Sequence, residues 1–258
     1  MKNYRKVSAI IGLVVIAAAL FLGWRYLTLS SSSSRSAVSG IDTLRINVEN
    51  ADIYVESTEG SGDKTEVEIK AKGKYRSSDI DVKTENNAVD IKQVGHPRLF
   101  TPNFDFGSRL DIYVKLPASR KDTLNVSSQN GKVSIDNVNS RIITVVSENG
   151  TIQMNRITGS KLLARSSSGA IRLEELTVSK VETIAESGSS RLVFSDKLNE
   201  IIANSSSTSG SIDYEFHNDI KLNLKSSGKL ISRIDSDTAS PNTIDMQSES
   251  GRMSVSRK

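Results

Sequence analysis

Residues suited to catalytic or metal chemistry are few and scattered in this 258-residue chain. There is no cysteine, and the two histidines, His96 and His217, stand far from any cluster with metal-ligand spacing. Serine is abundant, but no glycine-x-serine-x-glycine turn presents a serine nucleophile between a strand and a helix. No phosphate-binding loop is present either. We therefore expect a protein that is not an enzyme, with no catalytic residues, no metal site and no cofactor.

Acidic residues near expected turns are the next candidates for a metal site. They are Glu148, Glu174, Glu175 and Glu186. They do not stand in the glycine-rich array with aspartate that binds calcium in some β-helices, so solvent-exposed faces are the better interpretation.

A repeat organises the region that must position any functional residue. Four glycines recur at a constant interval, each closing a short polar run ahead of alternating apolar residues: Gly131, Gly150, Gly169 and Gly188. Looser copies end at Gly210, Gly228 and Gly251. A period near 20 is typical of stacked units that cannot bury their apolar faces alone. The repeat predicts an all-β, single-chain β-helix or solenoid with rungs of about 19 residues.

Each repeat holds two short segments in which apolar and polar residues alternate. In the second repeat the apolar positions are Ile143, Val145, Ile152 and Met154. This pattern predicts rungs made of a strand, a corner, a strand and a second corner, with glycine at the first corner because it adopts positive φ without strain. A row of hairpins is the alternative. It does not require like residues to recur at like positions in every repeat, so we favour the solenoid.

The amino-terminal residues predict a membrane anchor. Three basic residues, Lys2, Arg5 and Lys6, precede an uncharged stretch over residues 7–24. A helix of this length would span about 27 Å, close to the thickness of the hydrocarbon core. A cleaved signal peptide is less well supported, because no small-residue cleavage site follows the apolar run. The basic cluster predicts a single-pass cell-membrane protein with a cytoplasmic amino terminus.

These boundaries divide the chain into four parts. Residues 1–6 are expected to be a cytoplasmic stub, 7–24 a transmembrane helix, 25–40 a flexible Ser-rich linker and 41–258 an extracytoplasmic β-solenoid. Within the solenoid we expect irregular rungs over 41–117 and regular repeats over 118–258. The whole chain carries 34 basic and 30 acidic residues, but four basic residues precede residue 26, so the remainder is formally neutral. A neutral domain argues against nucleic-acid binding.

One segment, over residues 95–108, breaks the alternation. It holds three of the six phenylalanines in the chain, and long irregular loops are often functional. We therefore consider Arg98, Phe100, Phe104 and Phe106 as candidate contact residues for a partner or glycan. The alternative is that the loop covers an open end or face of the solenoid, with its phenylalanines buried.

Several motifs together resemble a known family. They are the anchor, Leu44-x-Ile46-x-Val48, the run from Asp111 to Pro117, and Leu124-x-Val126-x4-Gly131-x-Val133-x-Ile135 with its successors. Over residues 41–258 the chain resembles the adhesin-like family called Toastrack, and within it the anchored LiaG-like proteins encoded beside bacterial cell-envelope stress systems. This resemblance implies a single-chain β-helix. It supplies neither an assigned activity nor catalytic residues, and the word adhesin is itself an analogy.

Two classes of function remain open. The first is a noncatalytic cell-surface module, adhesin-like or scaffolding, that binds a cell-wall component, an envelope protein or a second copy of itself. The second is an accessory protein of a cell-envelope stress response that acts through a membrane partner contacting the anchor helix. An unrelated replacement anchor would distinguish them, because only the second function requires the native helix.

Overall fold

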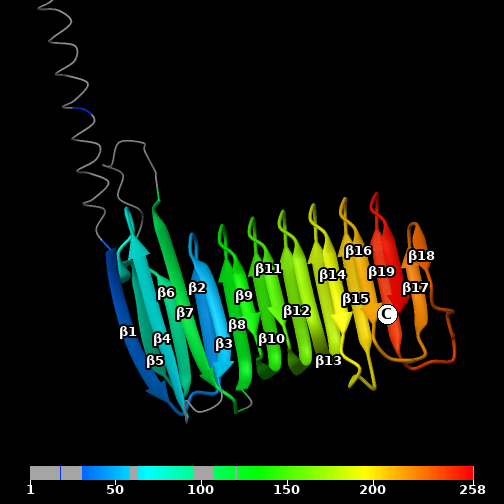
Figure 1. Ribbon diagram of the computed structural model, residues 1–258, viewed down its shortest axis with the longest axis horizontal. Helices are drawn as coiled ribbons and strands as arrows, with labels where there is room; N and C mark the ends of the chain where they lie inside the picture. The colour runs from blue at the N-terminus through cyan, green and yellow to red at the C-terminus, as the bar shows by residue number, and fades with distance from the viewer. Residues whose placement is uncertain (1–17, 19–30, 59–62, 96–106, 120, 258) are drawn as a thin grey trace, which may run out of the picture.

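Two long β-sheets form the body of the molecule and share one core. The computed structural model describes residue 18 and residues 31–58, 63–95, 107–119 and 121–257. The strands stand side by side like the bars of a rack, with turns along both long edges (Figure 1). We call the two sheets sheet A and sheet B.

Sheet A contains the strand that follows the glycine corner in each rung. Its spatial order is β1 (Ser31–Ser39), β4 (Lys64–Lys72), β7 (Arg109–Pro117), β3 (Asp52–Thr58), β9 (Val133–Asp136), β11 (Ile152–Asn155), the first part of β13 (Ile171–Ala185), β14 (Ser190–Phe194), β16 (Ile212–Phe216), β20 (Met253–Arg257) and β18 (Leu230–Ser232).

Sheet B contains the strand that precedes the glycine corner. Its spatial order is β5 (Ile80–Glu85), β6 (Ala88–Gln93), β2 (Thr43–Val48), β8 (Lys121–Ser128), β10 (Asn139–Ser147), β12 (Thr158–Ser166), the second part of β13, β15 (Ile202–Ser207), β19 (Thr243–Ser248) and β17 (Asn223–Ser227). A short 3₁₀ helix, η1 (Ser77–Asp79), precedes β5.

The regular rungs stack in parallel and in register. Ile143 of β10 lies opposite Leu124 of β8 on one side and Leu162 of β12 on the other. In sheet A, Ile152 lies between Val133 and Ile171 in the same way. Each of these partners is one full repeat away along the chain, so the predicted solenoid repeat is confirmed. Hairpins would pair antiparallel, so that alternative is wrong for the repeats.

The core is a single apolar column between the two sheets. The inward residues of the second repeat, Ile143, Val145, Ile152 and Met154, are all fully buried and belong to one hydrophobic cluster. Towards the carboxyl-terminal end the column widens to hold Phe194, Tyr214 and Phe216, whose rings stack on one another. This column fixes which side chains of each strand point outward.

The glycine corner needs glycine for a reason other than the predicted one. The described glycines with positive φ are Gly40, Gly73, Gly107 and Gly228, so the expectation of positive φ at the four regularly spaced glycines is wrong. Instead, successive corners pack backbone on backbone. A Cβ atom added to Gly150 would lie 1.8 Å from the carbonyl oxygen of Gly131. Positive φ occurs instead at the second corner of the regular rungs, where the residues are Asn137, Arg156 and Glu175.

A buried serine accompanies most glycine corners. Ser147 Oγ accepts a hydrogen bond from the N–H group of Gly150 at 2.9 Å, and Ser166 does the same for Gly169. Equivalent bonds recur in three other rungs, made by Ser128, Ser207 and Ser248. Each serine therefore pairs a backbone donor that the turn would otherwise leave buried without a partner.

Both ends of the stack depart from sequence order. The first rung, β2 with β3, lies between β6 with β7 and β8 with β9. The last strands, β19 and β20, lie between the rung of β15 with β16 and the rung of β17 with β18. The early region is irregular because β1, β4 and β5 pair antiparallel with their neighbours.

The Ser-rich segment is not a free linker in its described part. Residues 31–39 form β1, which pairs with β4 along its whole length, from Ser31 opposite Lys72 to Ser39 opposite Lys64. Backbone groups make the ladder, so a serine run can serve as an edge strand when a partner strand is available. An ion pair of 2.8 Å between Arg35 and Glu68 adds a side-chain contact across the two strands.

The anchor predicted over residues 7–24 falls, apart from Ala18, outside the described residues. In the part of the chain that is described, no helix has the length and apolar character needed to cross a membrane.

Candidate functional site

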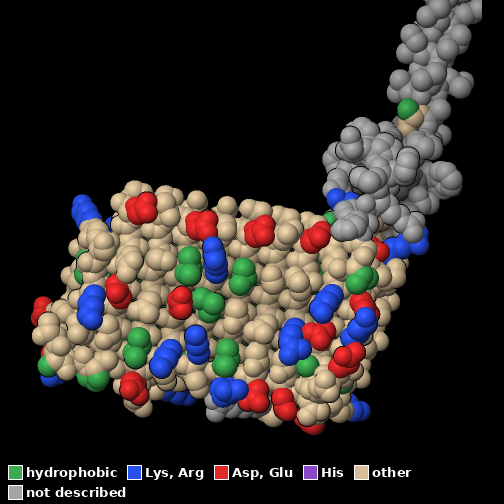
Figure 2. Space-filling model, turned by 180° about the vertical axis from the view of Figure 1, so that it is seen from behind, with side chains coloured by type: hydrophobic (Ala, Val, Ile, Leu, Met, Phe, Trp, Pro, Cys, Tyr) green, Lys and Arg blue, Asp and Glu red, His purple; other side chains and the backbone are tan. Residues whose placement is uncertain are grey.

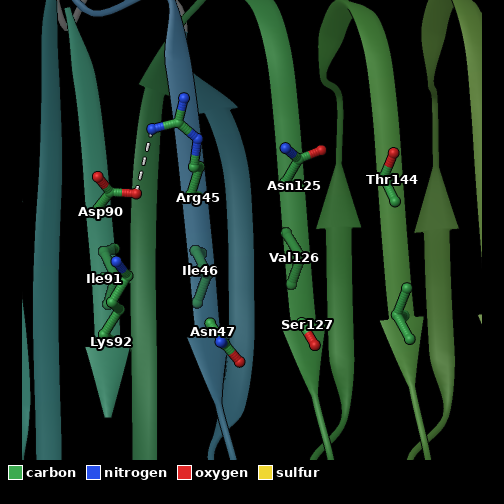
Figure 3. Close-up of a pocket in the computed structure, with 11 residues that line it drawn as sticks. Arg45, Ile46, Asn47, Asp90, Ile91, Lys92, Asn125, Val126, Ser127 and Thr144 are labelled. Atoms are coloured by element: carbon green, nitrogen blue, oxygen red, sulfur yellow. Dashed lines mark hydrogen bonds and ion pairs between the residues drawn. The ribbon is translucent and has the colours of Figure 1, made fainter. Parts of the chain in front are cut away.

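A shallow groove crosses the outer face of sheet B near its amino-terminal end. Its volume is about 270 Å³, and it runs over β6, β2, β8 and β10 (Figure 3). Its polar lining residues are Arg45, Asn47, Asp90, Lys92, Asn125, Ser127 and Thr144, and Val146 borders it at one end. All of these side chains occupy outward positions, because the residues between them point into the core.

Differences in side-chain length explain the groove. Arg45 lies opposite Asp90 on one side and Asn125 on the other, while Asn47 lies between Lys92 and Ser127. One long side chain therefore stands on each of β6 and β2, Lys92 and Arg45, whereas β8 carries only the short Asn125 and Ser127. The Arg45 guanidinium donates to Asp90 Oδ1 at 3.5 Å and is half-exposed, so it can reorient towards a ligand.

Beyond the groove, the same face carries a strip in which aliphatic side chains alternate with charged ones across the strands. Figure 2 shows hydrophobic side chains interspersed with basic and acidic side chains in the middle of this face. The apolar and charged members of the sheet B strip are Ile142, Val146, Leu163, Ile184, Ile202, Lys161, Lys180, Arg165 and Glu182. Ile202 is 42% exposed, although an outward position in a solenoid usually carries a polar residue.

Two lysines in the strip stand directly beside one another. Lys161 of β12 lies opposite Lys180 of β13, and the row continues with Ile142 on one side and Ile202 on the other. Across the described residues neither lysine has an ion-pair partner. Like charges opposite one another in a sheet destabilise it, so this pair is not explained by folding. Arg165 differs, because it forms a 3.0 Å ion pair with Glu186.

The predicted contact residues Arg98, Phe100, Phe104 and Phe106 lie outside the described residues. His96 lies there too. His217 is partly exposed, and its Nε2 atom is 3.6 Å from Glu215 Oε1. Nothing in the described residues brings three of the residues His, Cys, Asp and Glu into a group that could hold a metal.

A chain of hydroxyl groups in the described core is closed to solvent. Thr183 bonds to Ser205, and Ser205 Oγ lies 2.7 Å from Tyr214 Oη. Burial raises the pKa of Tyr214 well above its ordinary value. These groups satisfy one another inside the apolar column, so they serve packing and leave no nucleophile of their own facing a ligand.

A comparison with models of known protein families identifies the family of this chain. The model of the Toastrack DUF4097 family matches residues 41–258, which is most of the chain. The chain belongs to the Toastrack family. This confirms the family suggested by the sequence motifs. A comparison with curated proteins found no match.

Solved structures similar to this Toastrack protein come from Parabacteroides distasonis and Bacteroides fragilis. A "putative adhesin" from Parabacteroides distasonis ATCC 8503 is 11% identical, with 90% of this chain and 98% of that chain covered and a TM-score of 0.49. A "putative adhesin" from Bacteroides fragilis NCTC 9343 is 13% identical, covering 88% and 97%, with a TM-score of 0.46. A "putative lipid binding protein" from P. distasonis is 13% identical, covering 87% and 97%, with a TM-score of 0.47.

The sheet B strip of this Toastrack protein is a feature that motif searching missed. A signal was nevertheless present in the sequence. Apolar pairs interrupt the alternation at Ile142-Ile143, Val145-Val146, Leu162-Leu163 and Ile201-Ile202. In each pair one residue is buried and its neighbour must point outward. Such pairs therefore predict aliphatic side chains on the outer face.

Proposed function

We propose that this protein is a noncatalytic, adhesin-like binding module of the cell surface, held in the cell membrane by its amino-terminal segment. Its contact surface is the outer face of sheet B. The observation that carries the proposal is the sheet B strip. It exposes aliphatic side chains and a pair of lysines that has no ion-pair partner among the described residues, and the fold needs neither. The groove beside the strip supplies polar groups next to this apolar contact zone.

Energetic considerations favour a macromolecular partner with acidic groups. Fully burying an exposed isoleucine or leucine side chain contributes about 1.5–3 kcal/mol. Only Ile202 of the aliphatic residues in the strip is exposed and the others are already partly buried, so the strip supplies part of the energy of a micromolar contact and polar contacts must supply the rest. Lys161 and Lys180 would exchange mutual repulsion for attraction to anionic groups. A flat face that mixes aliphatic and charged side chains offers a broad contact area rather than an enclosed pocket, as a macromolecular partner requires.

The test is crosslinking of the full chain in living cells, followed by identification of the partner. Leu163→Ser combined with Ile184→Ser should abolish the major crosslinked species, because this variant removes apolar contact area without removing any lysine that the crosslinker needs. Arg172→Ser combined with Glu174→Ser, on the outer face of sheet A, is the matched control and should leave the species unchanged. Equal crosslinking in both variants would show that sheet B is not the contact face.

Replacing the anchor separates this proposal from a role in envelope-stress signalling. With an unrelated transmembrane helix in place of residues 7–24, a module that binds through sheet B keeps its partner. A protein that acts through helix contacts in the membrane loses its partner under the same replacement, even when the sheet B strip is intact.

A further inference from the structure

On the opposite sheet, three side chains form a stack on the outer surface. The rings of Tyr54 on β3 and Tyr113 on β7 lie parallel, with centroids 4.9 Å apart and an interplanar angle of 11°. Lys70 of β4 places its Nζ atom 4.5 Å from the centroid of Tyr113, on the side away from Tyr54. Tyr113 is therefore covered on both ring faces, and Tyr54 is covered on one.

An arginine fixes the hydroxyl end of Tyr54. Arg109 Nη2 donates to Tyr54 Oη at 3.2 Å, while its Nε atom donates to Asp111 Oδ1 at 2.7 Å. The guanidinium has only donors, so the tyrosine oxygen is the acceptor and the phenolic hydrogen stays available to donate. Tyr54 is thus held in place at its edge and by its covered face.

The other ring face of Tyr54 looks along the stack towards a small residue. In register the row continues from Tyr54 to Ser134 on β9 and then to Gln153 on β11. Strands are spaced by about 4.8 Å, so a third stacked ring would sit above Ser134. Serine is too short to fill that place. The surface above Ser134 is therefore a depression about one ring wide between Tyr54 and Gln153, which we call the step. The Cα atoms of Tyr54 and Gln153 are separated by two strand spacings, about 9.6 Å.

Polar groups flank the step, and the two aspartates among them are already paired with arginines. Asp52 lies 3.7 Å from Arg109, and its Oδ1 accepts the N–H of Lys132 at 2.9 Å. On the other flank Asp136 pairs with Arg156 and accepts from Asn155 Nδ2 at 3.0 Å. Gln153 is exposed and makes no side-chain hydrogen bond to any described residue. The step therefore offers an aromatic face and several hydrogen-bonding groups without a free carboxylate.

We propose that the step formed by Tyr54, Ser134 and Gln153 is a binding site for a neutral saccharide, one pyranose ring of which stacks on the free face of Tyr54. The C–H groups of a pyranose suit the electron-rich face of an aromatic ring, and its hydroxyls suit amide and carboxylate neighbours. A cationic ligand would bind best where an unpaired carboxylate lies beside the ring. Here Asp52 and Asp136 each already form an ion pair with an arginine. The site lies on sheet A and does not depend on the sheet B contact face.

The test is a binding titration with defined sugars. The full chain is solubilised in a polyoxyethylene detergent, which carries no sugar, and titrated with cellotetraose, tetra-N-acetylchitotetraose and choline. Binding is followed by saturation-transfer difference NMR. At least one of the two saccharides should bind, and Tyr54→Ala should weaken its binding at least tenfold. Tyr54→Phe should weaken it only a few-fold, because the stacking face is kept.

A second variant covers the case in which Tyr54→Ala unfolds. Ser134→Leu fills the step with a branched side chain, keeps the tyrosine stack, and should also weaken binding at least tenfold without lowering the melting temperature. Leu163→Ser on sheet B should leave saccharide binding unchanged. The proposal is overturned if neither saccharide receives saturation transfer, if Ser134→Leu binds as well as the wild type, or if choline outcompetes the saccharides at this site.

Discussion

Gly150 illustrates how strongly stacking determines a single residue. Its neighbour one rung away, Gly131, would collide with a Cβ atom at 1.8 Å, and Gly169 meets the carbonyl of Gly150 in the same way at 1.9 Å. The glycine spacing in the sequence identified the repeat correctly. It could not show that the requirement comes from the next rung, because that contact is a full repeat away along the chain.

Corner variants should separate crowding from hydrogen bonding. Gly150→Ala should lower the free energy of unfolding by about 3 kcal/mol, because the new methyl group forces two backbone corners apart. Ser166→Ala should cost about 1 kcal/mol, because it removes the acceptor for the N–H group of Gly169 and a long, 3.4 Å hydrogen bond to the carbonyl of Gly150 without adding any bulk. Chemical denaturation of the two variants measures both values. A Gly150→Ala variant as stable as the wild type would contradict the close-packed corner.

The buried phenol of Tyr214 should make stability depend on alkaline pH. Burial raises the pKa of Tyr214 in the folded state above its ordinary value of 10.0. In the unfolded chain the phenol ionises near pH 10, so its contribution to stability is complete below that pH and is lost as the pH rises above it. Tyr214→Phe should be about 1 kcal/mol less stable at pH 7, having lost its bond with Ser205.

The same pair of proteins provides the alkaline measurement. Above pH 10 the stability difference between wild type and Tyr214→Phe should shrink, because only the wild type has a phenol that the unfolded state can ionise. Denaturation curves of both proteins across pH 8–11 follow this difference, and the other titrating groups cancel between them. A constant difference over the range would show that Tyr214 ionises equally in both states.

At the scale of the strand, alternation decides which substitutions the fold tolerates. Ile152 and Ile171 are fully buried in neighbouring strands, whereas Thr151 is only partly buried and Arg172 is exposed. Ile152→Asp or Ile171→Asp should unfold the regular rungs, since each places a carboxylate in a narrow apolar column at a cost of several kcal/mol. Thr151→Asp and Arg172→Asp should be mild. Circular dichroism melting compares the four variants, and equal losses at adjacent positions would reject the in–out assignment.

The strands that sequence reasoning misplaced share one physical cause. The regular strands β8 to β14 were predictable because their own side chains alternate and recur. By contrast, β1 has serine at six of its nine positions and carries no such pattern. Its pairing depends on β4, which follows only after β2 and β3. Strand pairing by backbone groups leaves little trace in the side-chain sequence, so the edge strand looked like a linker.

At the scale of the whole molecule, both termini of the solenoid are interleaved with other rungs. Strands β19 and β20 bridge the rung of β15 with β16 to the rung of β17 with β18. Removing residues 243–258 should therefore do more than shorten the stack by one rung. It leaves the rung of β17 with β18 without its parallel neighbours and exposes the aromatic end of the core.

This deletion makes a measurable prediction about cooperativity. The shortened chain should lose protection from hydrogen exchange in β15 to β18, while β8 to β12, near the middle of the stack, stay protected because neighbouring rungs alone stabilise them. Native-state hydrogen exchange detected by mass spectrometry resolves the two regions. Uniform protection in the deletion variant would mean that the terminal strands are dispensable additions.

The candidate contact face was less predictable than the fold. The sequence directed attention to the phenylalanine-rich loop, because aromatic density is easy to recognise along a chain. The aliphatic part of the sheet B strip comes from residues 142, 146, 163, 184 and 202, which lie on four strands and share one face only when the rungs stack. The register of the rungs places these positions on one surface. Sequence motifs do not contain that register, so they could not reveal the surface.

Photocrosslinking from defined surface positions tests the central claim most directly. A photoreactive phenylalanine analogue is placed in the full chain in living cells, at Leu163 or Asn125 on sheet B, or at Arg172 or Glu174 on sheet A. We expect one shared crosslinked protein from both sheet B positions and no crosslinked protein from the two sheet A positions. Partner crosslinks from sheet A alone, or equal crosslinks from both sheets, would contradict the assignment of sheet B as the contact face.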